Sequence, residues 1–152
     1  MNKSILYRLF KLGAIPKTFQ PVLEQEGIVV SDEGMSGWFI CKDVKGPGKR
    51  YRHRSERFSG WLAVTRKRVL CYSYRKRQIN ISVDDPKIAC LHITIPSDGT
   101  LSISFESSAF RGGWEGIVEF KFKTEKAKRF YHALGAIGAR KGEFSRCGKP
   151  CG

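Results

Sequence analysis

The chain has 152 residues, 41% of them hydrophobic, and its 28 Lys and Arg exceed its 14 Asp and Glu to give a formal net charge of +14. This length fits one domain with its own core, and the hydrophobic content excludes general disorder. The positive charge favours polyanionic partners, namely an anionic membrane surface, a nucleic acid or an acidic protein.

Residues 3–12, KSILYRLFKL, have the apolar spacing of a short helix with one apolar face. Arg8 and Lys11 interrupt the apolar run, so the segment lacks the apolar centre of a secretory signal. No apolar run in the chain approaches the ~20 residues that a membrane-spanning helix needs. We assign residues 1–25 to a basic amphipathic segment that either lies in a membrane interface or packs on the domain.

The apolar residues then recur at every second position, which is typical of strands with one buried face. The first predicted strand centres on residues 38–42. A loop is predicted over KGPGKRYRHR (residues 45–54), with Gly-Pro-Gly as its turn signal. Strands over residues 58–64 and 69–74 follow, joined by a turn at Arg66–Arg68.

Most of the positive charge lies between residues 41 and 81, where thirteen Lys and Arg face only Asp43 and Glu56. Two trios of cations, Arg66–Arg68 and Arg75–Arg77, occupy predicted turns, where exposure carries no desolvation penalty. Because the charge is concentrated in one segment, it favours an anion-binding face over charge that serves solubility alone.

Further strands are predicted over residues 79–83, 88–95, 101–105 and 118–122, with a hairpin turn at Asp98-Gly99. Thr124 is the predicted N-cap of a helix that extends to Ile137. We expect a mainly β fold: an antiparallel β-sandwich or partly open barrel of about seven strands, with one C-terminal helix. Residues 139–152 are expected to form a basic flexible tail. The predicted core contains Leu62, Val64, Ile81, Leu91, Ile103, Phe120, Phe122, Phe130 and Leu134.

The sequence does not favour an enzyme, a metal site or a cofactor. Its three histidines have no Glu or Cys at ligand spacing, and GPGKR precedes a strand, so it is not a phosphate-binding loop. Cys41, Cys71 and Cys90 lie in strand-like patterns, where a free thiol packs as a small apolar group. Cys147 and Cys151 have no second pair to complete a zinc site. These cysteines suggest a reducing cytoplasm.

Several stretches together resemble the pleckstrin-homology-like fold. FSGWLAVTRKRVLCY, a later I-x-I-x-V, GTLSISF and EFKFKTEKAKRFYHAL are similar to bacterial PH and GRAM domains, in which G-x-L-x-[LV]-T-x-x-R-[LV]-[LV] spans the second and third strands. The resemblance covers roughly residues 26–138 and implies a PH-like domain over this range. It also implies a non-enzymatic domain that binds phosphoinositide-like head groups, lipid surfaces or proteins.

The resemblance implies where an anion would bind. In PH domains, a Lys and, after a gap, two basic residues of the first strand pair hold the head group, and Lys45, Arg50 and Arg52 are similarly spaced. The loop after the third strand lies at the same open end in a PH-like fold, whereas Arg66–Arg68 project from the opposite end. The predicted anion or lipid ligands are Lys45, Lys49, Arg50, Arg52, Arg54, Arg75, Lys76 and Arg77.

Two other partners remain open from the sequence. An acidic protein would also be attracted by these cations, in a scaffolding role. A single-stranded nucleic acid could stack its bases on aromatic residues that lie among the cations, namely Tyr51, Trp61, Tyr72 and Tyr74. We expect a cytoplasmic domain that associates peripherally with a membrane.

Overall fold

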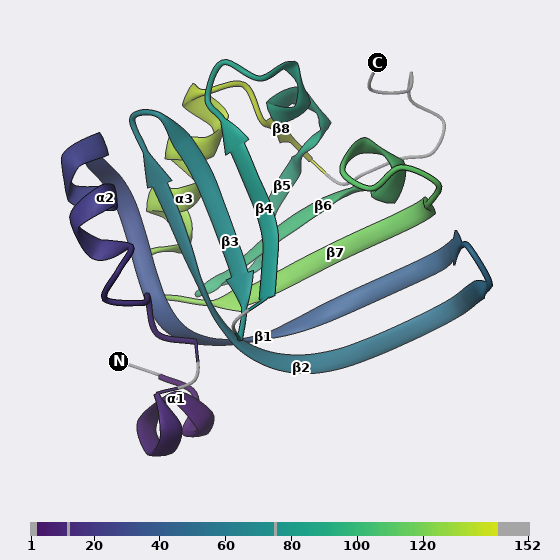
Figure 1. Cartoon of the computed structure of the whole chain (residues 1–152), viewed down its shortest axis with the longest axis horizontal. Coiled ribbons are helices and arrows are strands. Elements are labelled where there is room, and N and C mark those ends of the chain that lie inside the picture. The colour runs from purple at the N-terminus through teal and green to yellow at the C-terminus, as the bar shows by residue number, and fades with distance from the viewer. Residues whose placement is uncertain (1–2, 12, 75, 143–152) are drawn as a thin grey trace.

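A computed structural model describes residues 3–11, 13–74 and 76–142 (Figure 1). The fold is a single eight-stranded sheet with the strand order β4-β3-β2-β1-β7-β6-β5-β8. The strands are β1 (Ile28–Gly46), β2 (Lys49–Thr65), β3 (Arg68–Ser73), β4 (Lys76–Ser82), β5 (His92–Ser97), β6 (Thr100–Glu106), β7 (Glu115–Lys123) and β8 (Arg140–Lys141). The helices are α1 (Ile5–Phe10), α2 (Gln20–Glu26) and α3 (Ala127–Ala136), with 3-10 turns η1 (Pro86–Cys90) and η2 (Ser107–Ala109).

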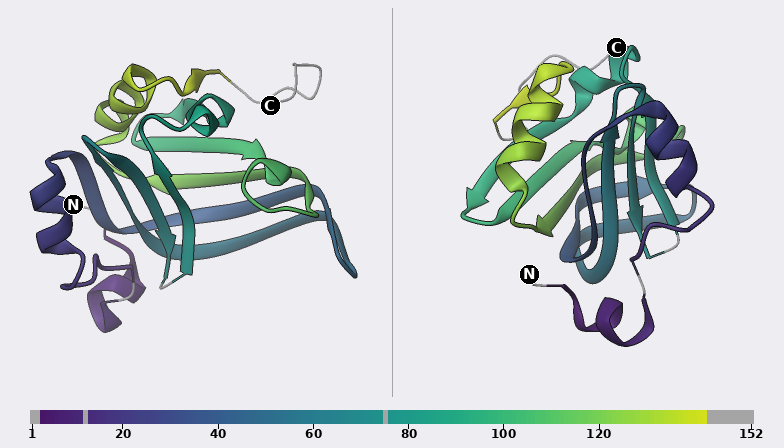
Figure 2. Two further views of the ribbon diagram at one scale, coloured as in Figure 1. Left: turned by 45° about the horizontal axis from the view of Figure 1, so that its top comes forward. Right: turned by 90° about the vertical axis from the view of Figure 1, so that its left-hand side faces the viewer.

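The predicted mainly β fold with one long C-terminal helix is confirmed. Strands β1 to β4 form one antiparallel meander and β5 to β7 a second, and β1 joins them by pairing with both β2 and β7. β8 is a two-residue strand that pairs in parallel with β5. The sheet curls into an open half-barrel (Figure 2).

The main core fills the concave side of the curled sheet. Helix α3 packs there through Phe130 and Leu134, whose side chains are both fully buried. All nine residues of the predicted core are buried. The prediction succeeds because strict alternation of apolar residues marks the face that each strand turns inward.

A smaller apolar cluster covers the convex side of β2 and β3. Its fully buried members are Trp61, Ala63, Leu70 and Leu23 of α2, and the ring of Phe19 lies 5.8 Å from that of Trp61. The second half of β2 is therefore buried on both faces, as its unbroken run of buried residues records. The sequence did not predict α2, because a seven-residue helix offers too few turns for a clear period.

Two predicted elements are wrong in type. The loop predicted over residues 45–54 is a hairpin: β1 continues to Gly46, β2 starts at Lys49, and Gly48 has the positive φ of 70° that the tight turn requires. The start of the strand predicted over residues 88–95 is instead η1. There the carboxylate of Asp85 accepts a hydrogen bond from the Lys87 N–H, and Pro86 fits the first turn.

The predicted cap of the last helix is displaced. Thr124 precedes α3 by three residues, and its hydroxyl accepts a hydrogen bond from the Lys126 N–H and donates one to Asp32 over 2.7 Å. Asp32 also accepts a hydrogen bond from Lys3. One carboxylate thus ties the N-terminal segment and the start of the last helix to β1.

The cysteines differ in state. Cys41 and Cys71 are buried free thiols, as predicted. Cys90 is disulfide-bonded, so the prediction of a free thiol is wrong there. Cys147 and Cys151 lie outside the described residues, as does most of the predicted tail. Among the tail residues that are described, Arg140 and Lys141 belong to the sheet.

Strand β2 bends sharply where the β1–β2 hairpin separates from β3 (Figure 1). β3 pairs only with Gly60–Val64, so the earlier part of β2 pairs with β1 alone. The ring of Phe58 lies at the bend, between Gly37 and Gly60, and a Cβ on Gly60 would lie 3.0 Å from it and collide with the carbonyl oxygen of Tyr72. The bend therefore requires glycine at this crossing.

We expect Gly60→Ala to lower the free energy of unfolding by about 1–3 kcal/mol, because its methyl group would push β2 away from β3. Denaturant unfolding measures this change. Gly112→Ala is the matched control, since a Cβ there meets nothing within 4 Å. Equal stability of the two variants would contradict the close crossing.

Helix α3 yields a second stability prediction. Phe130→Ala removes a fully buried ring from the main core and should cost about 3–5 kcal/mol. His132→Ala, an exposed position on the same helix, should change stability by less than about 0.5 kcal/mol. A loss at Phe130 that is no larger than that at His132 would mean that the helix does not close the core.

Candidate anion-binding cavity

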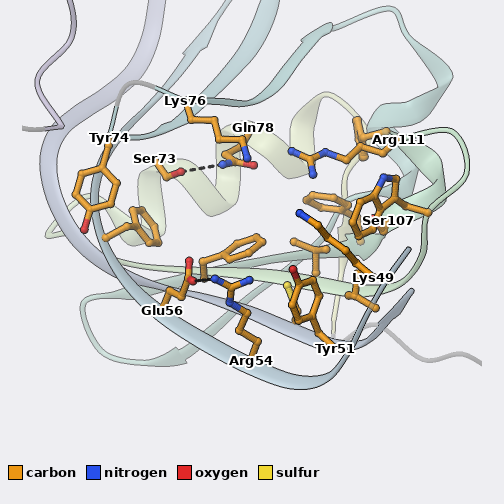
Figure 3. A pocket seen from close by; sticks show the side chains of 18 of the residues that line it. Lys49, Tyr51, Arg54, Glu56, Ser73, Tyr74, Lys76, Gln78, Ser107 and Arg111 are labelled. Carbon is orange, nitrogen blue, oxygen red and sulfur yellow. Dashed lines mark hydrogen bonds and ion pairs between the residues drawn. The ribbon is translucent and has the colours of Figure 1, made fainter. Parts of the chain in front are cut away.

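The bend in β2 leaves a cavity of about 660 Å³ on the concave side of the sheet (Figure 3). Its walls come from three separate parts of the chain. These are the β1–β2 hairpin, the connection from β3 to β4, and the connection from β6 to β7. The cavity lies near the end of β1, whereas the residues just before α3 are hydrogen-bonded near the start of that strand, at Ser31 and Asp32.

The floor of the cavity is apolar. Its apolar lining consists of Phe39, Cys41, Val44, Phe58, Phe105, Phe110, Trp114 and Val118. Phe105 and Phe110 meet edge to face at 4.7 Å, and Phe39 lies 5.0 Å from Phe120 of the main core. Burial raises the pKa of the Cys41 thiol, which therefore stays neutral and belongs to the apolar surface.

Cations surround the mouth of the cavity. Among the described lining residues, Lys49, Arg54, Arg57, Lys76 and Arg111 are basic and Glu56 is the one acid. Figure 3 shows Lys49 and Arg111 extending toward the middle of the cavity. Arg54 is ion-paired with Glu56 and lies 4.9 Å from the centre of the Tyr51 ring. The guanidinium group of Arg57 lies over Trp38 instead.

A local reversal in the hairpin decides which cations reach the cavity. Asp43 has a positive φ of 51°, and the register between β1 and β7 shifts beside it, between Lys42 and Lys45. Before it, the odd-numbered Phe39 and Cys41 line the cavity; after it, the even-numbered Val44 does. Their partners across the hairpin change in the same way, from Glu56 and Arg54 to Tyr51, and Lys49, the partner of Gly46, lines the cavity as well.

The structure therefore divides the predicted anion ligands. Lys49, Arg54 and Lys76 line one cavity, as expected from the two loops meeting at one end. Lys45, Arg50, Arg52 and Arg77 are exposed but do not line it. Arg75 lies outside the described residues.

Arg111 is a lining cation that the sequence did not single out. It follows η2 in the connection between β6 and β7, next to Gly112 and Gly113. No run of cations marks it, so only the pairing of distant strands could reveal that it lines the same cavity as Lys49. A lone Arg in a glycine-rich loop is a weak signal.

The first cationic trio lies away from the cavity, at the other end of β3. Arg68 donates hydrogen bonds from Nε to both carboxylate oxygens of Glu26, over 2.6 and 3.0 Å. These bonds hold the pKa of Glu26 below its ordinary value, although burial acts in the opposite direction. A carboxylate of α2 thus neutralises one cation of this trio, while the cavity keeps a surplus of positive charge.

The aromatic residues considered for base stacking do not form one surface. Trp61 is fully buried and stacks on Tyr72 at 4.5 Å on the convex side of the sheet. Tyr51 and Tyr74 line the cavity instead. The described residues hold no group of three or more His, Cys, Asp or Glu placed to bind a metal ion.

No protein-family model matches this sequence, and no curated protein matches it closely enough to count as a relative. In the described part of the chain, no helix has both the length and the apolar character needed to cross a bilayer.

Proposed function

We propose that this chain is a non-enzymatic binding domain that docks on membranes by holding an anionic lipid head group at the mouth of the cavity. The observation that carries the proposal is the convergence of Lys49, Lys76 and Arg111 from three separate connections. Cations gathered on a concave surface attract a phosphate more strongly than the same charges spread over a convex one. Guanidinium and ammonium groups are both suited to phosphate oxygens.

The strand order supports the resemblance to PH and GRAM domains. A four-stranded meander, a three-stranded meander and a terminal helix follow one another, and the connections after β1 and β3 meet at one end. Under this proposal the cavity is the head-group site of a PH-like domain. The ligands are part of the set expected from the sequence, because Lys49, Arg54 and Lys76 line the cavity and Arg50 and Arg52 do not.

A peripheral position on a membrane follows from the proposal. Disulfide bonds persist mainly in oxidising environments, so a disulfide bond bears on the compartment of the protein. The disulfide bond at Cys90 is therefore more typical of such a compartment than of the cytoplasm that the sequence suggested.

The proposal predicts that Lys49→Glu combined with Lys76→Glu weakens binding to vesicles of phosphatidylserine and phosphatidylcholine. Each cation near an anionic surface contributes about 1 kcal/mol, so the loss of two should weaken binding by roughly thirtyfold or more. Vesicle sedimentation at low and at physiological salt measures the affinity, with pure phosphatidylcholine as the blank.

Arg50→Glu combined with Arg52→Glu is the matched control. It makes the same change in charge at two residues of the β1–β2 hairpin that do not line the cavity, and should weaken binding much less. Equal losses in the two double variants would point to diffuse attraction and contradict the cavity as the site. Absence of binding to the anionic vesicles would overturn membrane docking and favour an acidic protein as the partner. Displacement of bound vesicles by a single-stranded oligonucleotide would favour a nucleic acid as the partner.

A further inference from the structure

The apolar floor of the cavity is larger than a head group requires. Phe39, Phe110 and Trp114 are only partly buried, although each packs on the main core. All three line the cavity, together with the nearly buried Val118 and Cys41. A phosphate held by Lys49, Lys76 and Arg111 would sit at the mouth and leave this surface exposed to water.

Such a surface stabilises an apolar ligand group that displaces water from it. Each methylene transferred from water to an apolar site contributes about 0.8 kcal/mol. A volume of about 660 Å³ falls within the range of small-molecule pockets, which are mostly apolar with a few polar groups that fix orientation. The cavity combines these features in one order, with cations outside and aromatic rings inside.

We infer that the ligand is a single-chain anionic amphiphile, whose alkyl chain enters the cavity while its acidic head group stays among Lys49, Lys76 and Arg111. This inference rests on the proposed function, since it places the same head group at the same mouth. It goes beyond that function because the protein then withdraws a chain from the membrane or from water, instead of binding a head group at the bilayer surface. The apolar floor and the basic rim complement the two ends of such a molecule.

The polar groups of the cavity suit this orientation. Gln78 donates a hydrogen bond from its side-chain amide to the hydroxyl of Ser73 over 2.8 Å, so these two groups satisfy each other. The ion pair between Arg54 and Glu56 lies on the hairpin side of the cavity, beside the Tyr51 ring. The alkyl chain of the ligand can therefore lie against Phe39, Phe110 and Trp114 without burying an unpaired carboxylate.

A chain-length series tests the inference. Inorganic phosphate, butyl phosphate, octyl phosphate and dodecyl phosphate share one head group and are titrated calorimetrically into the full chain below their micelle concentrations. We expect the affinity to rise roughly threefold to fourfold for each methylene that enters the cavity, and then to level off when the cavity is full. An affinity that does not change with chain length would overturn the inference.

Two variants test whether the alkyl chain of the ligand lies on the apolar floor of the cavity. Phe110→Ala enlarges the floor at a half-buried position and should move the plateau to a longer chain. Val118→Trp fills the floor and should move it to a shorter one, while Val22→Ala, an exposed position on α2, should leave it unchanged. If Phe110→Ala left the plateau where it is in the parent chain, the alkyl group would lie elsewhere and the inference would fail.

The same series separates this inference from the proposed function. Lys49→Glu combined with Lys76→Glu should weaken all four phosphates by a similar factor, because both cations act on the shared head group. Suppose that inorganic phosphate and anionic vesicles both bind and that this variant weakens both, while alkyl-chain length has no effect. That result would overturn the alkyl-chain site and leave head-group docking in place. If neither the phosphates nor the vesicles bind, both proposals fail.

Discussion

The close crossing of β1, β2 and β3 around the ring of Phe58 is the constraint on which the rest of the structure depends. Phe58 packs edge to face on Phe120 and Phe122, so it fixes the bend of β2 to the main core. Gly37 and Gly60 allow the neighbouring backbones to approach this ring. Because β2 turns away from β3 here, the hairpin and the β3–β4 connection diverge, and the space between them becomes the cavity.

The distribution of charge follows from the same geometry. Cations at the mouth of an open cavity stay hydrated, so their exposure costs little until a ligand arrives. At the other end of β3, Glu26 neutralises Arg68, and residues 20–26 cover the apolar convex face. The positive charge that the sequence concentrates in one segment is thus divided in space. Arg68 is neutralised in the fold, Lys49, Arg54 and Lys76 line the cavity, and other cations such as Arg50 and Arg52 are exposed outside it.

Much of the fold could be predicted from local patterns, and the errors have physical causes. Alternation identified the inward face of each strand, as at Ile103 and Phe120, because one side of the sheet is buried. It could not show that KGPGKRYRHR is a hairpin, since the strands there are mostly exposed and lack apolar alternation. Nor could it place Arg111, because a single Arg in a loop carries no periodic signal. Arg54 and Arg52 could not be distinguished, because the positive φ of Asp43 reverses the faces of the hairpin without any signal in composition.

The central claim is that anionic lipid binds in this cavity, and amide chemical-shift mapping tests it most directly. Isotope-labelled protein would be titrated with dodecyl phosphate below its micelle concentration. The account predicts the largest shifts in residues 39–58, 73–78 and 105–118, with little change in residues 20–26 and 66–68. Shifts centred on Arg66–Arg68, or spread evenly over all the exposed cations, would contradict it.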